Sequence, residues 1–190
     1  EFLTSDSEGK IVKWDLNNEG RNFSLVYSGS GAIDVMAVSP DAGWLACAEQ
    51  DNSIRMINLG GNEEEYLLNG HSGKIRSLLF SFDGKSLYSA ALDGRVLKWN
   101  LAARTSVDIT TGQTFITSID VTTDNSTIAG ISDRGEGLVW NTGSKEVRFT
   151  IGSDGRKISS IRFHPGGDQL AVGYDDGLME LWDIPRREKI

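Results

Sequence analysis

The sequence contains one cysteine, three prolines and two histidines in 190 residues, and it has fewer basic than acidic side chains, 19 against 27. A single cysteine, Cys47, cannot form an intrachain disulfide, so nothing in the chain indicates an oxidising compartment and a cytoplasmic location is favoured. The net charge of −8 argues against nucleic acid as the main partner, because phosphate binding requires a clustered positive surface.

Long apolar runs are also missing from the sequence. No stretch approaches the roughly eighteen consecutive apolar residues of a membrane span, and no window of about ten residues has helical spacing. The sequence therefore predicts no membrane partner. Glycine, by contrast, occurs 22 times, and with so few prolines this favours tight turns between short regular elements, which is the profile of an all-β domain.

One short segment recurs five times along the chain, each time ending in an anchor residue that is followed by Asp or Asn. Four of the anchors are tryptophans and one is isoleucine. They are separated by 43, 42, 41 and 42 residues, a period regular enough to indicate a repeat architecture. The anchors are Trp14, Ile57, Trp99, Trp140 and Trp182.

Each period contains the same order of short segments, and the third repeat is the clearest. Residues 74–80 and 86–91 are apolar-rich, residues 95–99 lead to the anchor, and residues 106–110 are polar. Turn residues separate the segments, which is typical of antiparallel hairpins. The inner segments are almost continuously apolar and should be covered on both faces, whereas the polar fourth segment should lie at the solvent edge.

The third repeat resembles the WD-repeat family of β-propellers, whose repeats begin near Gly-His and end in Trp-Asp. The residues that carry the resemblance are Gly70-His71, Phe80 to Gly84, Asp93-Gly94 and Trp99-Asn100. The resemblance covers residues 1–190, with repeats that end near residues 16, 59, 101, 141 and 183. It implies an all-β fold, a β-propeller built of four-stranded antiparallel blades.

The repeats depart from the family pattern in places. Trp14-Asp15 and Trp182-Asp183 keep the Trp-Asp pair, the other three repeats have Asn at its second position, and the third repeat alone has Gly-His. The resemblance therefore rests on the period and on the positions of the turns.

The phase of the repeat predicts an incomplete ring of about four and a half blades. In the family each blade runs from its inner strand outwards, so residues 1–5 read as the second strand of a blade that lacks its first. The last blade has three strands, and residues 185–190 could barely start a fourth. Five blades are touched and three are complete, which favours a piece of a longer chain over a small ring closed by swapping or by unusual termini. Apolar faces and unpaired edges at both ends predict self-association.

His71, Ser89, Asp93 and Trp99 fall where the family places a buried, hydrogen-bonded tetrad. The resemblance implies that Asp93 accepts from the imidazole, that a hydroxyl bridges, and that the indole N–H ends the chain. That hydroxyl comes from Ser89 or from a neighbouring strand position. A His-Ser-Asp trio also suggests a hydrolase, but the sequence has no nucleophile elbow and no oxyanion-hole loop. A structural role is therefore favoured, with no catalytic residue.

No cofactor and no metal site are predicted. His164 lies in a turn and Cys47 in a strand, so a soft-metal site cannot be assembled. The turn Asp175 to Gly177 lacks the alternating oxygen ligands and the distal glutamate of a calcium loop. Gly152 to Gly155 is glycine-rich but is not followed by a helix, as a phosphate loop would be.

Residues that flank the first strands are predicted to form a partner-binding face. When the first strands are aligned on their leading isoleucines, at positions 33, 75, 116 and 158, four flanking side chains combine positive charge with one aromatic ring. By resemblance they lie around the central channel, where partners usually dock, and they are not needed to fill the core. Ordinary solvated loop residues are an equally weighted interpretation. The four residues are Lys74, Arg76, Phe115 and Lys157.

The sequence thus predicts a non-catalytic scaffold that binds a protein or peptide partner. One alternative is a sensor or regulatory segment of a larger signalling enzyme. A less favoured alternative is a propeller enzyme that holds a ligand or metal with acidic residues around the channel. The aligned flanking positions contain one Asp and no His, whereas a metal enzyme needs several converging ligands.

Overall fold

The computed structural model describes residues 2–15, 22–29, 31–61, 64–110, 114–152 and 155–190. These residues form antiparallel sheets and contain no helix, and therefore none that could cross a membrane. The all-β prediction is confirmed.

The described residues form one three-stranded and four four-stranded sheets, each in chain order from its first strand to its last. The first sheet contains β1 (Phe2–Ser5), β2 (Lys10–Trp14) and β3 (Phe23–Ser28). The second contains β4 (Met36–Val38), β5 (Trp44–Ala48), β6 (Ile54–Asn58) and β7 (Glu65–Leu68). The third contains β8 (Ile75–Phe80), β9 (Ser86–Ala91), β10 (Val96–Asn100) and β11 (Thr105–Asp108). The fourth contains β12 (Ile116–Val121), β13 (Thr127–Ser132), β14 (Gly137–Asn141) and β15 (Val147–Ile151). The fifth contains β16 (Ile158–Phe163), β17 (Gln169–Tyr174), β18 (Met179–Asp183) and β19 (Glu188–Lys189).

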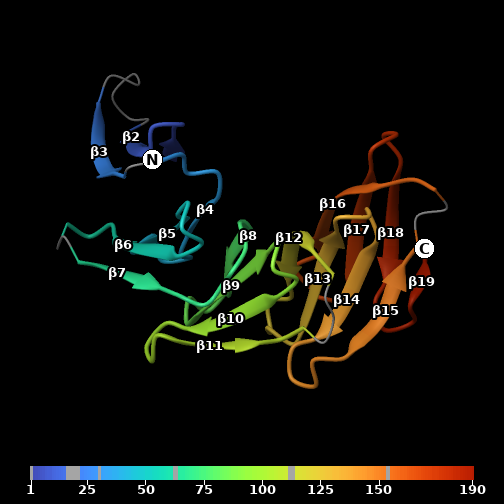
Figure 1. Cartoon of the computed structure of the whole chain (residues 1–190). Coiled ribbons are helices and arrows are strands. Elements are labelled where there is room, and N and C mark those ends of the chain that lie inside the picture. The colour runs from blue at the N-terminus through green and yellow to red at the C-terminus, as the bar shows by residue number, and fades with distance from the viewer. Residues whose placement is uncertain (1, 16–21, 30, 62–63, 111–113, 153–154) are drawn as a thin grey trace.

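The sheets follow one another around an open arc, with the two ends of the chain at its two ends (Figure 1). The first strands β4, β8, β12 and β16 lie next to one another on the inside of the arc, and β7, β11 and β15 lie on the outside. This is an incomplete β-propeller of about four and a half blades, as the repeat phase predicted. The first sheet lacks an inner strand, and the fifth ends in a fourth strand of only two residues.

The hydrophobic core lies between neighbouring sheets. Four clusters of buried residues each combine side chains of two consecutive sheets. In the cluster between the second and third sheets, Ala46 and Met56 meet Leu87 and Trp99. Alternate residues of a strand point to opposite faces, so each sheet covers the preceding sheet with one face and the following sheet with the other. We call each such junction a seam.

Two kinds of turn define the two faces of the arc. The turns between the first and second strands, residues 39–43, 81–85, 122–126 and 164–168, lie on what we call the turn face. Three of these turns are built alike: the hydroxyl of Ser39, Ser81 or Thr122 donates to an Asp two residues later, at 2.5 to 2.6 Å. The loops that enter the first strands and the turns that follow the second strands lie at the other end of the sheets, the entry face. These are residues 70–74, 92–95, 114–115, 133–136, 155–157 and 175–178.

A bulge marks the point where each first strand leaves the entry face. Pairing with the second strand shifts directly after Ile75, Ile116 and Ile158, which leaves one extra residue in each first strand. A bulge re-aims side chains at the edge of a sheet. The extra residues are Arg76, Thr117 and Ser159.

The second sheet departs from this pattern. Its first strand starts only at Met36, although the alignment placed Ile33 level with the leading isoleucines. Ile33 is buried, and its carbonyl accepts a hydrogen bond from the Ser5 hydroxyl of the first sheet at 3.1 Å. The carbonyl of Ile33 therefore bonds across a seam, whereas the carbonyl of Val35 accepts from the Ala48 N–H of its own sheet at 3.0 Å.

Candidate interaction face and the buried tetrad

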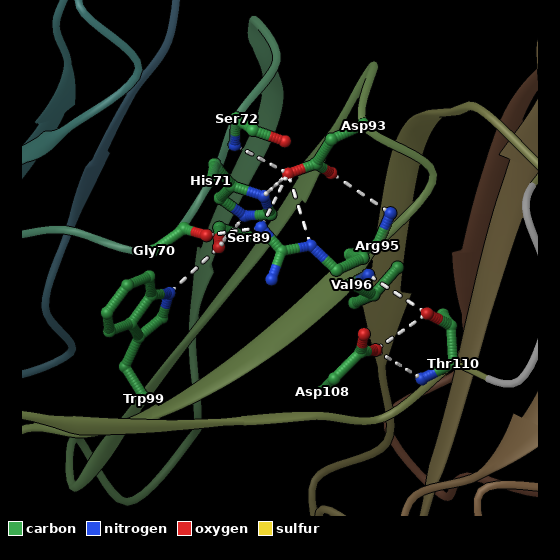
Figure 2. Close-up of polar contacts among 10 residues, drawn as sticks. All are labelled: Gly70, His71, Ser72, Ser89, Asp93, Arg95, Val96, Trp99, Asp108 and Thr110. Carbon is green, nitrogen blue, oxygen red and sulfur yellow. Dashed lines mark hydrogen bonds and ion pairs between the residues drawn. The ribbon is translucent and has the colours of Figure 1, made fainter.

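The four residues of the predicted tetrad lie together in the third sheet (Figure 2). Nδ1 of His71 lies 2.9 Å from Oδ2 of Asp93, and Nε2 lies 2.7 Å from the Ser89 hydroxyl. The Trp99 indole N–H donates to the same hydroxyl at 2.8 Å. The four side chains come from the loop before β8, from β9, from the turn after β9 and from β10, so the network joins four consecutive segments of one blade.

The direction of every proton in this network follows from the charge of Asp93. Burial alone would raise the pKa of Asp93, but hydrogen bonds from the Ser72 N–H and from His71 outweigh it and lower the pKa to about 2. Burial lowers the pKa of His71, and the attraction of Asp93 only partly opposes this. A neutral imidazole beside an ionised carboxylate must donate from Nδ1 and accept at Nε2. The Ser89 hydroxyl therefore donates to His71 and accepts from Trp99.

Asp93 also fastens the loop that enters β8. The Ser72 N–H donates to its Oδ2 at 2.9 Å, and the Arg95 guanidinium lies 3.0 Å from the same oxygen. The Arg95 guanidinium in turn donates to the carbonyl of Gly70. Gly73 lies against the backbone of this turn, because a Cβ built on it would come within 2.6 Å of the Asp93 nitrogen. Residues 70–73 are therefore held along their whole length.

The trio His71, Ser89 and Asp93 does not have the accessibility of a hydrolase site. Ser89 is fully buried, and the His71 side chain has no exposed area. The serine oxygen is already engaged by both the imidazole and the indole. A nucleophile must reach a substrate carbonyl, whereas this hydroxyl lies in the seam below a closed loop.

Other repeats keep fragments of the same network, which the sequence reasoning missed. In the first sheet the Trp14 indole donates to the Thr4 hydroxyl at 2.8 Å, at the positions that Trp99 and Ser89 hold in the third. In the second repeat, Cys47 holds the position of Ser89 and Ile57 holds the position of Trp99. Replacing both partners of a buried hydrogen bond by apolar groups leaves no polar atom unpaired. The period alone could have pointed to Thr4.

The fourth and fifth sheets have no hydroxyl at the position of Ser89, and each packs its anchor tryptophan in a different way. Gly130 takes the serine position in the fourth, and a Cβ there would come within 2.9 Å of the Trp140 ring. In the fifth, the Tyr174 hydroxyl donates to the buried carboxylate of Glu180 at 2.8 Å and the Trp182 indole donates to it at 3.2 Å. These hydrogen bonds outweigh burial and lower the pKa of Glu180.

The four residues of the predicted partner-binding face are exposed on the entry face. Lys74 and Arg76 flank Ile75 at the start of β8, Phe115 precedes β12, and Lys157 precedes β16. Phe115 is 45% exposed. Because β8, β12 and β16 lie side by side, the four residues belong to three consecutive blades on the inner side of the arc.

Lys74 forms an ion pair with Asp34 across the seam between the second and third sheets. The hydrogen bond and the charge of Lys74 lower the pKa of Asp34. The two residues line a pocket of about 490 Å³ together with Gln50. The sequence reasoning placed Asp34 at this face but missed the pairing, since the alignment shows equivalent positions within each repeat and not contacts between repeats.

Phe115 borders a smaller pocket of about 140 Å³, which is also lined by Asp133, Arg134 and Glu136. The bulge residue Thr117 is not free to contact a partner through its hydroxyl, which donates to the carbonyl of Ile131 at 3.2 Å. The Ser159 hydroxyl makes the equivalent bond to Gly173. Beside these bonded hydroxyls, the face exposes charged side chains, the Phe115 ring and the leucines Leu92 and Leu178.

Within the described part of the chain, no three His, Cys, Asp or Glu side chains converge in a way that could hold a metal ion. His164 is exposed on the turn face, where its Nδ1 accepts from the Gly166 N–H at 3.0 Å. Cys47 is buried, and burial raises the pKa of its thiol to about 12.

Comparison with known proteins agrees with this geometry. The family model for the WD domain, G-beta repeat, matches residues 22–58, 62–100 and 144–183, which is more than half of the chain. Each matched segment contains the last strand of one sheet and the first three strands of the next: β3 to β6, β7 to β10, and β15 to β18. The second matched segment, residues 62–100, contains all four residues of the tetrad.

Similar curated proteins come from plants and yeast. Over 93% of this chain, it is 26% identical to periodic tryptophan protein 2 of Arabidopsis thaliana. Over 96% of the chain, it is 25% identical to the COMPASS component SWD3 of Saccharomyces cerevisiae and 23% identical to the guanine nucleotide-binding protein subunit beta-1 of Nicotiana tabacum. The chain spans 20%, 61% and 52% of the lengths of these three relatives. The repeat, the propeller sheets and the family match together establish that the chain belongs to the WD-repeat family.

Proposed function

We propose that this chain is a non-catalytic scaffold that binds a protein partner on its entry face, through Phe115 and the cations of β8 and β16. The observation that carries the proposal is the combination of a half-exposed aromatic ring before β12 with exposed cations at the starts of the two neighbouring inner strands, β8 and β16. Aromatic and arginine side chains contribute most to binding at protein interfaces. Two of the relatives are described by name as a subunit or a component of an assembly, which supports a partner of this class.

A role as the sensor segment of a larger signalling enzyme is compatible with the same face, because such a segment also works by binding. The buried position of Ser89 and the absence of a convergent metal-ligand group among the described residues give the catalytic alternative less support. The proposal therefore concerns which face binds and what class of molecule binds there.

Site-specific photocrosslinking tests the proposal. A photoreactive phenylalanine analogue at position 115 is compared with the same analogue at Phe82, which is 71% exposed on the turn face. Both variants are exposed to extract from the source cells. We expect a discrete protein adduct at position 115 that is absent at position 82, and purified partner should then bind the chain and compete with the adduct.

The kinetics of binding to the purified partner supply a second test. Reversing the charge of Lys74 and Arg76 together should slow association, and Phe115→Ala should speed dissociation, because charges steer encounters while buried contacts hold the complex. If these variants bind as the wild type does and changes at Asp41, Asp83 and His164 abolish binding, the turn face is the working face and the proposal is wrong.

A further inference from the structure

The cations of the entry face are not equivalent. Lys74 is paired with Asp34 across a seam. Within the described residues, Arg76 and Lys157 are exposed and neither has an ion-pair partner. Asp175 lies close to Lys157, but its carboxylate faces the backbone N–H of Lys157, at 3.4 Å. Among the three cations of the predicted partner-binding face, Asp34 therefore pairs with Lys74 and attracts Arg76 without forming an ion pair with it, while Lys157 has no ion-pair partner among the described residues.

The ion pair between Asp34 and Lys74 shows two repeat positions that meet across one seam. Asp34 follows the leading isoleucine of the second repeat, and Lys74 precedes the leading isoleucine of the third. The same two positions in the next pair of repeats are held by Arg76 and Phe115. One repeat further along they are held by Thr117 and Lys157. In the order of the inner strands, Phe115 before β12 therefore lies between Arg76 of β8 and Lys157, which precedes β16.

Phe115 also borders the turn between β13 and β14, which carries a net negative charge. The pocket beside Phe115 is lined by two acids, Asp133 and Glu136, and one base, Arg134. An incoming carboxylate is therefore favoured along the inner strands and disfavoured over the pocket. Because the chain as a whole carries −8, an acidic ligand would be repelled elsewhere on the surface and directed to this position.

Building on the proposed function, we propose that the partner presents an acidic segment whose carboxylates pair with Arg76 and Lys157 and whose apolar residue between them packs on Phe115. Asp34 lowers the net positive charge of this site, because its carboxylate forms an ion pair with Lys74. Asp34 is therefore a specificity-determining residue, and removing it releases a third cation toward the ligand.

Peptide binding to the purified chain tests this inference. The probe is a fluorescein-labelled peptide, Gly-Glu-Glu-Gly-Leu-Gly-Glu-Glu-Gly, and the comparison peptides carry Lys in place of Glu or Ala in place of Leu. Fluorescence anisotropy gives Kd in low salt and in about 0.5 M salt, where charges more than a few ångströms apart are screened. We expect binding of the acidic peptide, weaker binding without the Leu, and loss of binding in high salt.

Four substitutions identify the residues involved. Arg76→Glu and Lys157→Glu should each weaken binding by about tenfold, and Asp34→Ala should strengthen it by about twofold to fivefold. Lys85→Glu makes the same charge reversal on the turn face and should leave Kd within about twofold of the wild type. Circular dichroism of each variant checks that the sheets are retained.

Three outcomes overturn the inference: tighter binding of the Lys peptide, weaker binding by Asp34→Ala, or an equal effect of Lys85→Glu and Arg76→Glu. The proposed function fails separately. A partner that crosslinks at position 115 but binds through basic residues would leave the scaffold proposal in place and refute the acidic ligand. Absence of any adduct at position 115 would refute the scaffold proposal itself.

Discussion

At the scale of single residues, the network around His71 makes one buried side chain responsible for the order of a loop. Substitution of His71 by Ala removes the acceptor of the Ser89 hydroxyl and one donor to Asp93, and leaves both groups buried. We expect the free energy of unfolding to fall by about 1 to 3 kcal/mol, the cost of unpaired buried polar groups. Urea denaturation of the wild type and the variant measures this difference.

His164 supplies the control for that experiment. Its side chain is exposed, and its contact with Gly166 lies within one turn, so His164→Ala should change stability by less than about 0.5 kcal/mol. Equal urea midpoints for the wild type and His71→Ala would mean that the tetrad does not stabilise the third blade.

The same residue gives the stability a defined pH dependence. The pKa of His71 is lower in the folded chain than its ordinary value of 6.5, so between those two values the unfolded chain binds more protons. The stabilisation by neutral His71 is then complete above pH 6.5 and is lost as the pH falls below it. Asp93, with its pKa lowered from 3.8 to about 2, adds a second loss of stability as the pH falls below 3.8.

Stability measured as a function of pH checks this expectation. The slope below pH 6.5 should be shallower in His71→Ala than in the wild type, because the variant no longer carries the titrating imidazole. Unchanged slopes would show that His71 is protonated equally in the folded and unfolded chain.

At the scale of strands and turns, the seams depend on close approach between neighbouring blades. Gly135, in the turn after β13, has a φ of 80°, and a Cβ there would meet Cα and Cβ of Lys157 at 2.8 to 2.9 Å. Gly177 holds the same position in the fifth sheet with a φ of 87°, and a Cβ there would meet nothing within 4 Å. The two glycines therefore share backbone strain and differ in crowding.

Alanine substitutions separate these two effects. Both variants carry the cost of a left-handed alanine, about 1 to 2 kcal/mol. Gly135→Ala should be more destabilising than Gly177→Ala by a further amount of about 1 to 3 kcal/mol, typical of overpacking. Thermal or urea unfolding measures the difference. Indistinguishable stabilities would argue against tight contact between the fourth and fifth sheets at this turn.

The elements of the fold could be predicted largely from the sequence, because the period and the Asp-Gly and Asn-Ser turns act within each repeat. The exception is the late start of β4, where the carbonyl of Ile33 accepts a hydrogen bond from Ser5 of the preceding repeat. The Asp34 and Lys74 ion pair was missed as well. Contacts between repeats depend on how one sheet is placed against the next, and no pattern within a single repeat encodes that placement.

At the scale of the whole molecule, the two terminal sheets expose apolar side chains that inner sheets bury. Phe2 is 45% exposed on the first sheet and Met179 is 75% exposed on the fifth, whereas Leu45 and Ile54, at the positions of Phe2 and Met179 in the second sheet, are fully buried. Burying such surfaces is favourable by roughly 25 cal/mol per Å². We therefore expect this chain, taken by itself, to self-associate.

Light scattering against concentration checks the expectation. Phe2→Glu and Met179→Glu should each reduce association, and Phe82→Glu, at an exposed aromatic on the turn face, should not. A stable monomer of about 20.7 kDa at all concentrations would show that the exposed faces are too small or too irregular to hold two chains together.

The position of the core between sheets also changes what counts as a unit of this molecule. Each of the four buried clusters draws on two repeats, so no repeat owns a core. The sequence repeats about every 42 residues, but the buried contacts that hold the fold together lie at the seams between repeats. Loss of one internal repeat would destroy two clusters and force two sheets that never met to make a new one. The effect of a substitution at a seam therefore depends on two repeats together: the sheet face that carries it and the facing side of the next sheet.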